Sequence, residues 1–302
     1  MVSSSNAPLR LAYISGGFPV WALFVAQTQG FFESHGVHCE ITHTGSSTVQ
    51  MQGLREGRFD VGLQLPDHVV RAGLHGSNLC VLAAQSHPPD VALVSSPTIQ
   101  NIEQLKGHRI AVDGTSSGYA LLLVKLLSSL GWASHDYQLV EVGDSQQRVQ
   151  ALRSGALMAS FINPPLDKAL VNDGFVRLTT TLRAFPSYPG PVVAAHRDWA
   201  DAHPELAKGF QYAWAEAWRW LLDPNNQAIA IDIALKHLGA EVTAAKIALQ
   251  NLQHQDVPHI SAAGMSQVID LVWKNESVGQ KPLPAPEGYF WPSITTTKNK
   301  LT

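Results

Sequence analysis

The chain contains 302 residues, of which 45% are hydrophobic and 15% are charged. This composition is typical of a globular protein, and the length allows two domains with substantial cores. The formal net charge of -3, without a long Lys or Arg run, argues against nucleic-acid binding. No segment reaches the ~18 consecutive apolar residues that a membrane-spanning helix needs, so we expect no membrane span.

Strands and helices alternate through the first part of the chain. Short apolar runs bounded by glycine or proline indicate buried strands, and longer segments with helical spacing separate them. Pro19 suits the first turn of a helix, and Gly36 suits the residue after its last turn. We predict strands at residues 9–14, 37–42, 59–63 and 79–84, and helices at 21–32, from Ser46 or Ser47 onward, and from Leu65 to a stop at Gly73 or Gly76.

The following hundred residues repeat this plan, which makes an internal duplication the most informative feature of the chain. In each copy a strand leads through a glycine-bearing turn into a helix, and a later helix ends at a Leu-Arg-x-Gly sequence, at residues 54–57 and 152–155. The predicted strands of this part are 91–94, 109–112, 138–141, 158–161 and 175–178. Helices are predicted at 102–105, 118–130 and 145–154, and a further helix follows the turn at 163–165 and ends at 172. A strand at 192–195 then precedes an almost entirely helical stretch from 204 to 274.

Two proline-rich breaks divide the chain into two α/β lobes. Residues 85–89 and 186–191 interrupt regular structure and are the predicted crossings between the lobes. We therefore assign residues 1–88 and 193–302 to lobe one and residues 89–192 to an inserted lobe two, with the crossings acting as a hinge. Ligands bind outside the carboxyl ends of strands in such sheets, so we expect a ligand cleft between the lobes.

Two segments resemble type 2 periplasmic binding proteins. Residues 26–37 are similar to the VAxxxGFFxxxGL signature of the sulfonate, taurine and nitrate branch, whose superfamily includes the thiamine-pyrimidine synthases. Residues 105–112 are similar to the family's LKGKxIAV, and the similarity extends over about residues 9–220. The resemblance implies a two-lobed periplasmic-binding-protein-like fold, each lobe a mixed sheet flanked by helices, and a role in ABC-type import.

Hydroxyl-rich turns are the leading candidates for holding an anion. They precede predicted helices, where free N–H groups and the helix dipole favour negative charge. A plain helix cap is the alternative interpretation of each turn. The predicted anion ligands are Ser46 and Ser47 in lobe one, and Gly114, Thr115, Ser116 and Ser117 in lobe two.

Other candidates would line the cleft. An aromatic or alkyl part of a ligand could pack on Phe18, Pro19 and Trp21, although Trp21 could equally pack inside lobe one. By resemblance, Asn163 matches the position at which a polar residue after a lobe-two strand reaches the ligand. Tyr188, which lies near two prolines, could close over the cleft.

Residues 64–68 form the most chemically suggestive segment. The resembling thiamine-pyrimidine synthases carry a lysine for pyridoxal phosphate at the position of Gln64, and their histidine falls on His68. Because glutamine cannot form a Schiff base, we expect no pyridoxal phosphate and no other cofactor. Gln64, Asp67 and His68 could bind the ligand, Asp67 and His68 could be the acid–base pair of an enzyme, or Asp67 could simply cap a helix.

Cysteines and histidines give no metal-site pattern. Cys39 and Cys80 lie in predicted strands, where two buried thiols are favoured over a disulfide. The 13 histidines form no HExxH or HxH array, so no metal site is expected. The first eight residues lack a signal-peptide pattern, which leaves a cytoplasmic protein, or a periplasmic one whose signal has been removed.

We predict that the protein binds a small organic anion in the cleft with hinge closure. The anion would be a carboxylate or sulfonate, with an apolar or aromatic body. The protein would then be the substrate-binding component of an ABC-type importer and would dock on the transporter's membrane subunits. The alternative is a cytoplasmic, cofactor-independent decarboxylase or lyase on the same scaffold, with His68 as acid or base and Asp67 beside it.

Overall fold

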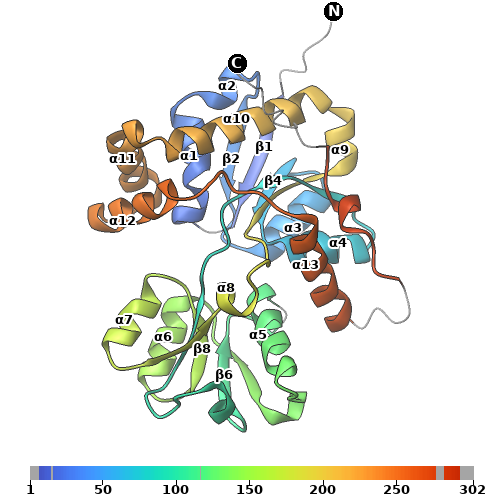
Figure 1. Cartoon of the computed structure of the whole chain (residues 1–302). Helices are drawn as coiled ribbons and strands as arrows, with labels where there is room; N and C mark the ends of the chain where they lie inside the picture. Colours follow the sequence, from blue (N-terminus) through green and yellow to red (C-terminus); the bar gives the residue numbers. More distant parts are fainter. Residues whose placement is uncertain (1–6, 15, 116, 277–281, 293–302) are drawn as a thin grey trace, which may run out of the picture. The chain divides into compact units, whose positions relative to one another are not determined.

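The computed structural model describes residues 7–14, 16–115, 117–276 and 282–292. The chain divides into two compact units, and each has its own sheet and hydrophobic core (Figure 1). Unit 1 comprises Met1–His87, Pro189–Met265 and Pro284–Thr302, and unit 2 comprises Pro88–Tyr188 and Ser266–Leu283.

Unit 1 contains a five-stranded mixed sheet in the order β2-β1-β3-β10-β4. The first three of these strands run parallel, whereas β10 lies antiparallel to both β3 and β4. Val61 of β3 pairs with Leu11 of β1 on one side and with Ala195 of β10 on the other. The strands are β1 (Leu9–Tyr13), β2 (Cys39–His43), β3 (Val61–Gln64), β4 (Leu79–Ala84) and β10 (Val192–His196).

Helices α1 and α10 supply the largest side chains of the unit 1 core, which include the buried Trp21 and Trp218. Trp214 Nε1 donates to the Ala84 carbonyl oxygen at 2.8 Å, which fastens α10 to the end of β4. The predicted helix 21–32 is interrupted, because Gly30 adopts a left-handed φ of 72° and a new helix begins after it. The helices of unit 1 are η1 (Phe18–Val20), α1 (Trp21–Thr28), α2 (Phe31–Ser34), α3 (Ser47–Arg55), α4 (Pro66–Leu74), α9 (Arg197–Ala202), α10 (Pro204–Leu222), η4 (Pro224–Asn226), α11 (Gln227–Leu238), α12 (Val242–Gln253) and η5 (Pro286–Tyr289).

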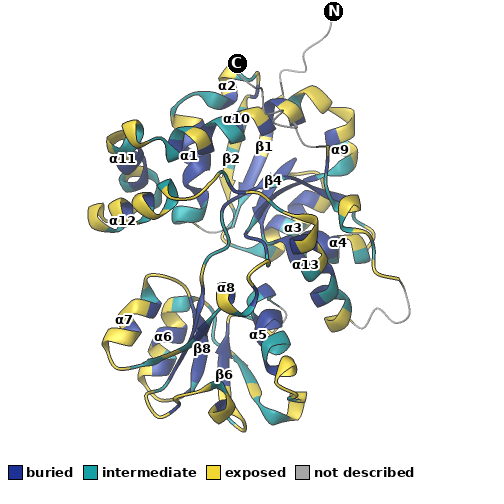
Figure 2. Cartoon of the chain, viewed as in Figure 1, coloured by how far each residue is buried: buried dark blue, intermediate teal, exposed yellow. Residues whose placement is uncertain are grey.

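Unit 2 repeats the unit 1 sheet, with the order β7-β6-β8-β5-β9. Again three neighbouring strands are parallel, and β5 lies antiparallel to both β8 and β9. Figure 2 shows β6 and β8 as buried strands between helices with exposed outer faces. The elements are β5 (Ala92–Ser95), η2 (Ile102–Leu105), β6 (Arg109–Val112), α5 (Gly118–Ser129), η3 (Ser134–Asp136), β7 (Gln138–Glu141), α6 (Ser145–Arg153), β8 (Ala159–Ile162), α7 (Leu166–Asn172), β9 (Val176–Thr180) and α8 (Thr181–Ala184).

The matching strand orders and directions confirm two α/β halves, each a mixed sheet flanked by helices. Parallel strands need helical crossovers, which explains why helices alternate with strands in both repeats. Within the described residues, none of the helices is both long and apolar enough to cross a bilayer.

Helix α13 (Ala262–Asn275) departs from the domain division expected from the sequence. That division placed all of residues 193–302 in lobe one, whereas the structure groups residues 266–283 with unit 2. Leu271 packs into the unit 2 core, and Asp270 Oδ2 lies 3.5 Å from Lys125 Nζ of α5. The apolar face of a helix does not reveal which core it will join. The two proline-rich breaks lie far from α13 in the sequence, so they could not assign it to a unit either.

The segment after η5 covers the outer edge of the unit 1 sheet. Phe290 forms a parallel bridge with Val81 of β4, and the Trp291 N–H donates to the Val81 carbonyl at 3.0 Å. The Trp291 indole is buried and donates to Asp201 Oδ1 at 2.8 Å. An exposed edge strand is a template for unwanted pairing, so this segment both stabilises unit 1 and protects β4.

We expect Trp291→Ala to lower the free energy of unfolding by about 3–5 kcal/mol, because it removes a buried indole and leaves a cavity. Urea denaturation followed by circular dichroism measures this change. The matched control is Leu283→Ala, which truncates a side chain that is 55% exposed and should change stability by less than about 0.5 kcal/mol. A loss below about 1 kcal/mol in Trp291→Ala would show that the segment does not hold the edge.

Both cysteines are free thiols in the unit 1 sheet. They lie on β2 and β4, the two outermost strands, which are separated by four strand spacings or about 19 Å. A disulfide between them is therefore geometrically excluded. Burial is the main reason why the pKa of each thiol is raised to about 12.

These raised pKa values make the fold sensitive to alkaline pH. An unfolded cysteine ionises near pH ~8.5, while the folded thiols stay protonated, so stability falls as pH rises from about 8.5 toward 12. Within that window each thiol lowers the free energy of unfolding by about 1.4 kcal/mol for every pH unit. We expect the Cys80→Ala variant to show a shallower decline of unfolding free energy between about pH 9 and 11. Equal slopes in wild type and variant would contradict the assignment.

Candidate functional site

Polar residues gather at one edge of the unit 2 sheet. Strands β6 and β8 are parallel neighbours, with Ala111 opposite Ser160, so their carboxyl ends reach the same edge. Ligands favour this edge in α/β sheets. Asp113 follows β6 and Asn163 follows β8. A small pocket opens here, and its lining includes Val91, Asp113, Tyr119, Arg148, Ser160 and Asn163.

Arg148 of α6 is the buried cation of this pocket, with an exposed fraction of only 6%. Its Nε donates to the Phe161 carbonyl oxygen at 3.3 Å, and its Nη2 donates to Ser145 Oγ at 3.0 Å. Nη1 donates to the Gly143 carbonyl oxygen. These bonds fix the plane of the guanidinium and use three of its five N–H donors, which leaves two for another acceptor.

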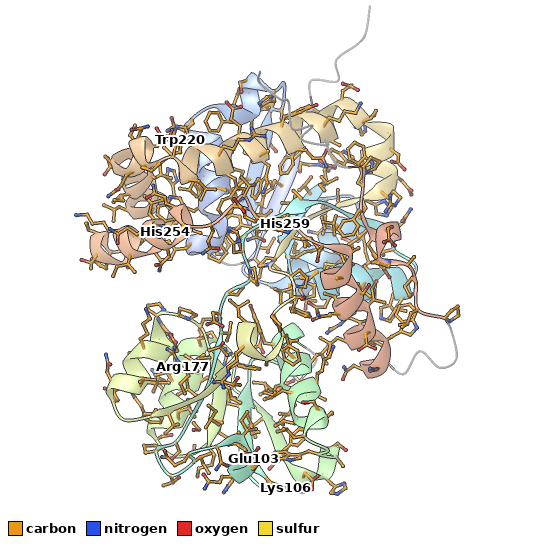
Figure 3. All side chains as sticks on the ribbon, viewed as in Figure 1. Glu103, Lys106, Arg177, Trp220, His254 and His259 are labelled. Atoms are coloured by element: carbon orange, nitrogen blue, oxygen red, sulfur yellow. The ribbon has the colours of Figure 1, made fainter. Side chains whose placement is uncertain are left out.

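The charge of Arg148 lacks a direct counterion among the described residues. Two other unit 2 arginines have one: Arg153 pairs with Asp173, and Arg177, labelled in Figure 3, pairs with Asp167. Burial lowers the pKa of Arg148, and the more distant carboxylates of Asp113 and Asp144 act in the opposite direction. A guanidinium stays protonated in proteins, so the pocket holds a desolvated positive charge that an anion could compensate.

Asn163 and Asp113 are among the other polar residues that line the pocket with Arg148. Asn163 Nδ2 donates to Ser145 Oγ at 3.1 Å, so one hydroxyl holds both the asparagine and the guanidinium. Asp113 Oδ1 accepts the Ser117 hydroxyl at 2.5 Å. The structure thus brings Asn163 and part of the predicted 114–117 turn to the same edge as Arg148.

The 114–117 turn already holds a carboxylate of the chain itself. The Thr115 backbone N–H and Oγ1 both donate to Glu141 Oε1, at 2.7 and 2.9 Å. Ser117 is the N-cap of α5 and accepts the Ala120 N–H at 3.1 Å, as the capping interpretation expected. Gly114 lies within the turn, and Ser116 lies outside the described residues. The donors of Thr115 are therefore not open to an external anion while Glu141 occupies them.

The two Thr115 donors lower the pKa of Glu141, with the backbone N–H as the larger cause. We expect the pKa of Glu141 to lie below its ordinary value in a carbon-13 NMR titration. Thr115→Val removes the hydroxyl donor but keeps the N–H, so the pKa should rise only part of the way toward the ordinary value. Thr98→Val, in an exposed turn of the same unit, is the control. An unchanged Glu141 pKa in Thr115→Val would refute this hydrogen-bond assignment.

In unit 1, the corresponding edge carries two buried glutamines. Gln50 Nε2 donates to the Leu63 carbonyl oxygen at 2.9 Å and to Gln64 Oε1 at 3.3 Å. Ser46 is the N-cap of α3 and accepts the Val49 N–H at 3.3 Å, and Ser47 is the first residue of that helix. Ser46 therefore has the capping role that was the alternative to anion binding, whereas Ser47 does not cap the helix.

Asp67 and His68 lie in the first turn of α4. Asp67 is fully buried, and its Oδ2 lies 3.1 Å from Arg71 Nη2, one helical turn away. Asp67 does not cap the helix, because the N-cap residue is Leu65 and no side chain accepts a backbone N–H at that end of α4. His68 is half-buried, and its Nδ1 is a buried atom without a hydrogen bond among the described residues. Among the same described residues, no hydrogen bond joins the side chains of Asp67 and His68.

The aromatic candidates fall into different environments. Trp21 is fully buried and its Nε1 donates to the Ala230 carbonyl oxygen at 3.0 Å, so it packs inside unit 1 and has no face for a ligand. Phe18 is half-buried against Trp21, with ring centroids 5.3 Å apart. The Pro19 carbonyl accepts from Gln85 Nε2 at 3.2 Å. Tyr188 is half-buried against the unit 2 core.

Sequence reasoning missed Arg148, although the duplication contained a signal for it. When the repeats are aligned on α3 and α6, Arg148 takes the position of Gln50. Each side chain donates to the third residue of the following parallel strand, Leu63 for Gln50 and Phe161 for Arg148. A helix residue that faces a strand end in both repeats is buried, so a charged residue there in one repeat stands out.

The fold and site define a protein with the periplasmic-binding-protein architecture. The chain belongs to the NMT1-like family, whose model matches residues 4–235.

The structure is similar to the periplasmic aliphatic sulphonate binding protein SsuA of Escherichia coli. The TM-score is 0.76 at 18% identity, covering 95% of this chain and 93% of that one. It is also similar to a ligand-binding component of an ABC-type import system from Staphylococcus aureus, crystallised with zinc. That TM-score is 0.73 at 15% identity, covering 95% of this chain and 97% of that one. Among the described residues, no group of three His, Cys, Asp or Glu could hold a metal ion.

A sequence relative of Brucella abortus (strain 2308) carries the provisional name of binding protein. It is 24% identical over 209 residues, which is 68% of this chain. The match spans only 64% of that relative's own length.

Proposed function

We propose that the protein is a solute-binding protein that holds a small organic anion at the unit 2 pocket. Arg148 carries this proposal: its guanidinium is buried in the pocket lining, and the described residues give it no ion pair. Its two remaining N–H donors suit the paired oxygens of a carboxylate or one edge of a sulfonate. The sulphonate ligand named for the Escherichia coli relative is of the same chemical kind.

The rest of the lining supports a ligand with an apolar or aromatic body. Val91, Ala120 and Phe161 are apolar, and Tyr119 offers a ring against which a flat group could stack. Binding sites of this type combine a mostly apolar wall with a few fixed polar groups. In this pocket the fixed polar groups include Arg148 and Asn163.

The cellular role that we propose is delivery of the anion to an ABC-type importer. The named import component of Staphylococcus aureus and the periplasmic sulphonate binder share this fold, and both names support the assignment. The partners would be the membrane subunits of the transporter. The place of action would be the periplasm.

The test replaces Arg148 by Met, which has a similar length but no charge. The substitution leaves no buried charge without a partner, although the carbonyls of Phe161 and Gly143 lose a donor, so we expect a folded variant of lower stability. Titration calorimetry with propionate, benzoate, ethanesulfonate and nitrate should show binding of at least one anion to wild type. We expect Arg148→Met to weaken that binding about 100-fold, which corresponds to the loss of charge-assisted hydrogen bonds.

Arg153→Met is the matched control, because Arg153 lies on the same helix but pairs with Asp173 at the surface. Its affinity for the anion should stay within about twofold of wild type. Circular dichroism and urea unfolding verify that both variants are folded. Unchanged affinity in a folded Arg148→Met variant would refute the proposed function, as would the absence of binding by wild type.

A further inference from the structure

The pocket that holds Arg148 also contains a carboxylate. Asp113 lines it, and its side chain is exposed at the edge of the sheet. Its Oδ1 accepts the Ser117 hydroxyl at 2.5 Å, which orients the carboxyl group. Oδ2 accepts no hydrogen bond within the described residues of the chain, so one oxygen of an oriented carboxylate remains open to a donor from a ligand.

An acid group alone would match only one of the two charges in the pocket. Arg148 is the only cationic side chain in the described lining, and Asp113 offsets it there. Two further acidic residues follow along the chain at the same edge: Glu141 ends β7, and Asp144 is the N-cap of α6. A purely anionic ligand would gain attraction from Arg148 and meet repulsion from Asp113.

A ligand that carries both a cationic group and an acid group would match both side chains. Its acidic oxygens would accept the two remaining N–H donors of Arg148, and its N–H groups would donate to Asp113 Oδ2. Both contacts are charge-assisted, and neither leaves a pocket charge without a partner. An acid without a cationic group would leave the Asp113 carboxylate unpaired beside the bound acid group.

We propose that the ligand is a small zwitterion, in which Arg148 binds the acid group and Asp113 binds the ammonium group. The inference rests on the proposed function, because it assigns the ligand class of the same pocket. Asp113 then determines specificity, because it selects acids that also carry an amino group over the same acids without one.

The experiment compares matched ligands that differ by one amino group: β-alanine against propionate, and 4-aminobutyrate against butyrate. Titration calorimetry with wild type should give at least tenfold tighter binding for the amino member of one pair. Asp113→Asn keeps an acceptor for Ser117 but removes the charge, so this preference should fall below threefold while propionate binds equally well or better.

Asp144→Asn is the control for a general electrostatic effect. Asp144 caps α6 through the Gln147 N–H and influences Arg148 without lining the pocket, and asparagine is also a good N-cap. This variant should change the affinities of both pair members equally and leave their ratio at the wild-type value.

The outcomes separate the two proposals. Binding of propionate that depends on Arg148, with no preference for β-alanine, overturns the zwitterion inference and leaves the proposed function intact. A preference that persists in Asp113→Asn, or that falls equally in Asp144→Asn, also overturns it. If no member of either pair binds wild type, the zwitterion inference fails, and the proposed function stands only if benzoate, ethanesulfonate or nitrate binds. If binding does not depend on Arg148, both proposals fail.

Discussion

A buried guanidinium without a direct counterion is the constraint on which the unit 2 site depends. Desolvating a charge is expensive, and the fold tolerates Arg148 because two carbonyl oxygens and a hydroxyl accept from it. These acceptors lie on the loop before α6, on α6 itself and on β8, so the guanidinium ties the helix to the strand end. The same contacts hold the guanidinium in a fixed orientation, which is the preorganisation that a binding site needs.

The duplicated sheets explain how one architecture supports two different strand-end environments. In both units the fourth residue of a helix donates to a carbonyl on the neighbouring parallel strand, at Gln50 and at Arg148. Unit 1 has the neutral amide at this position, with Gln64 beside it, whereas unit 2 has the charge. The backbone geometry is shared, and the chemistry differs through one side chain in each repeat.

Periodicity and breakers predicted most strands and helices, because these patterns follow from local burial and backbone preference. The two-sheet arrangement also followed, since the repeat was visible in the order of strands and turns. The sequence could not predict contacts between residues far apart in the chain. Trp21 could have faced a ligand or a core, and only its contact with Ala230 decides between them. A helix cap was one interpretation of Asp67, yet Asp67 is buried and lies 3.1 Å from Arg71 one turn later. The hydrogen bond from Thr115 to Glu141 joins residues 26 positions apart, and no local sequence pattern predicts it.

The segment that covers β4 has a consequence for how the protein is made on the ribosome. The unit 2 sheet is complete once Thr180 has been synthesised, whereas the unit 1 sheet also needs β10 and then the residues around Trp291. During translation the outer edge of β4 therefore stays open for more than 200 residues of further synthesis. A nascent chain in that state exposes an unpaired strand, so shielding by a chaperone would matter most for the half that begins first and finishes last.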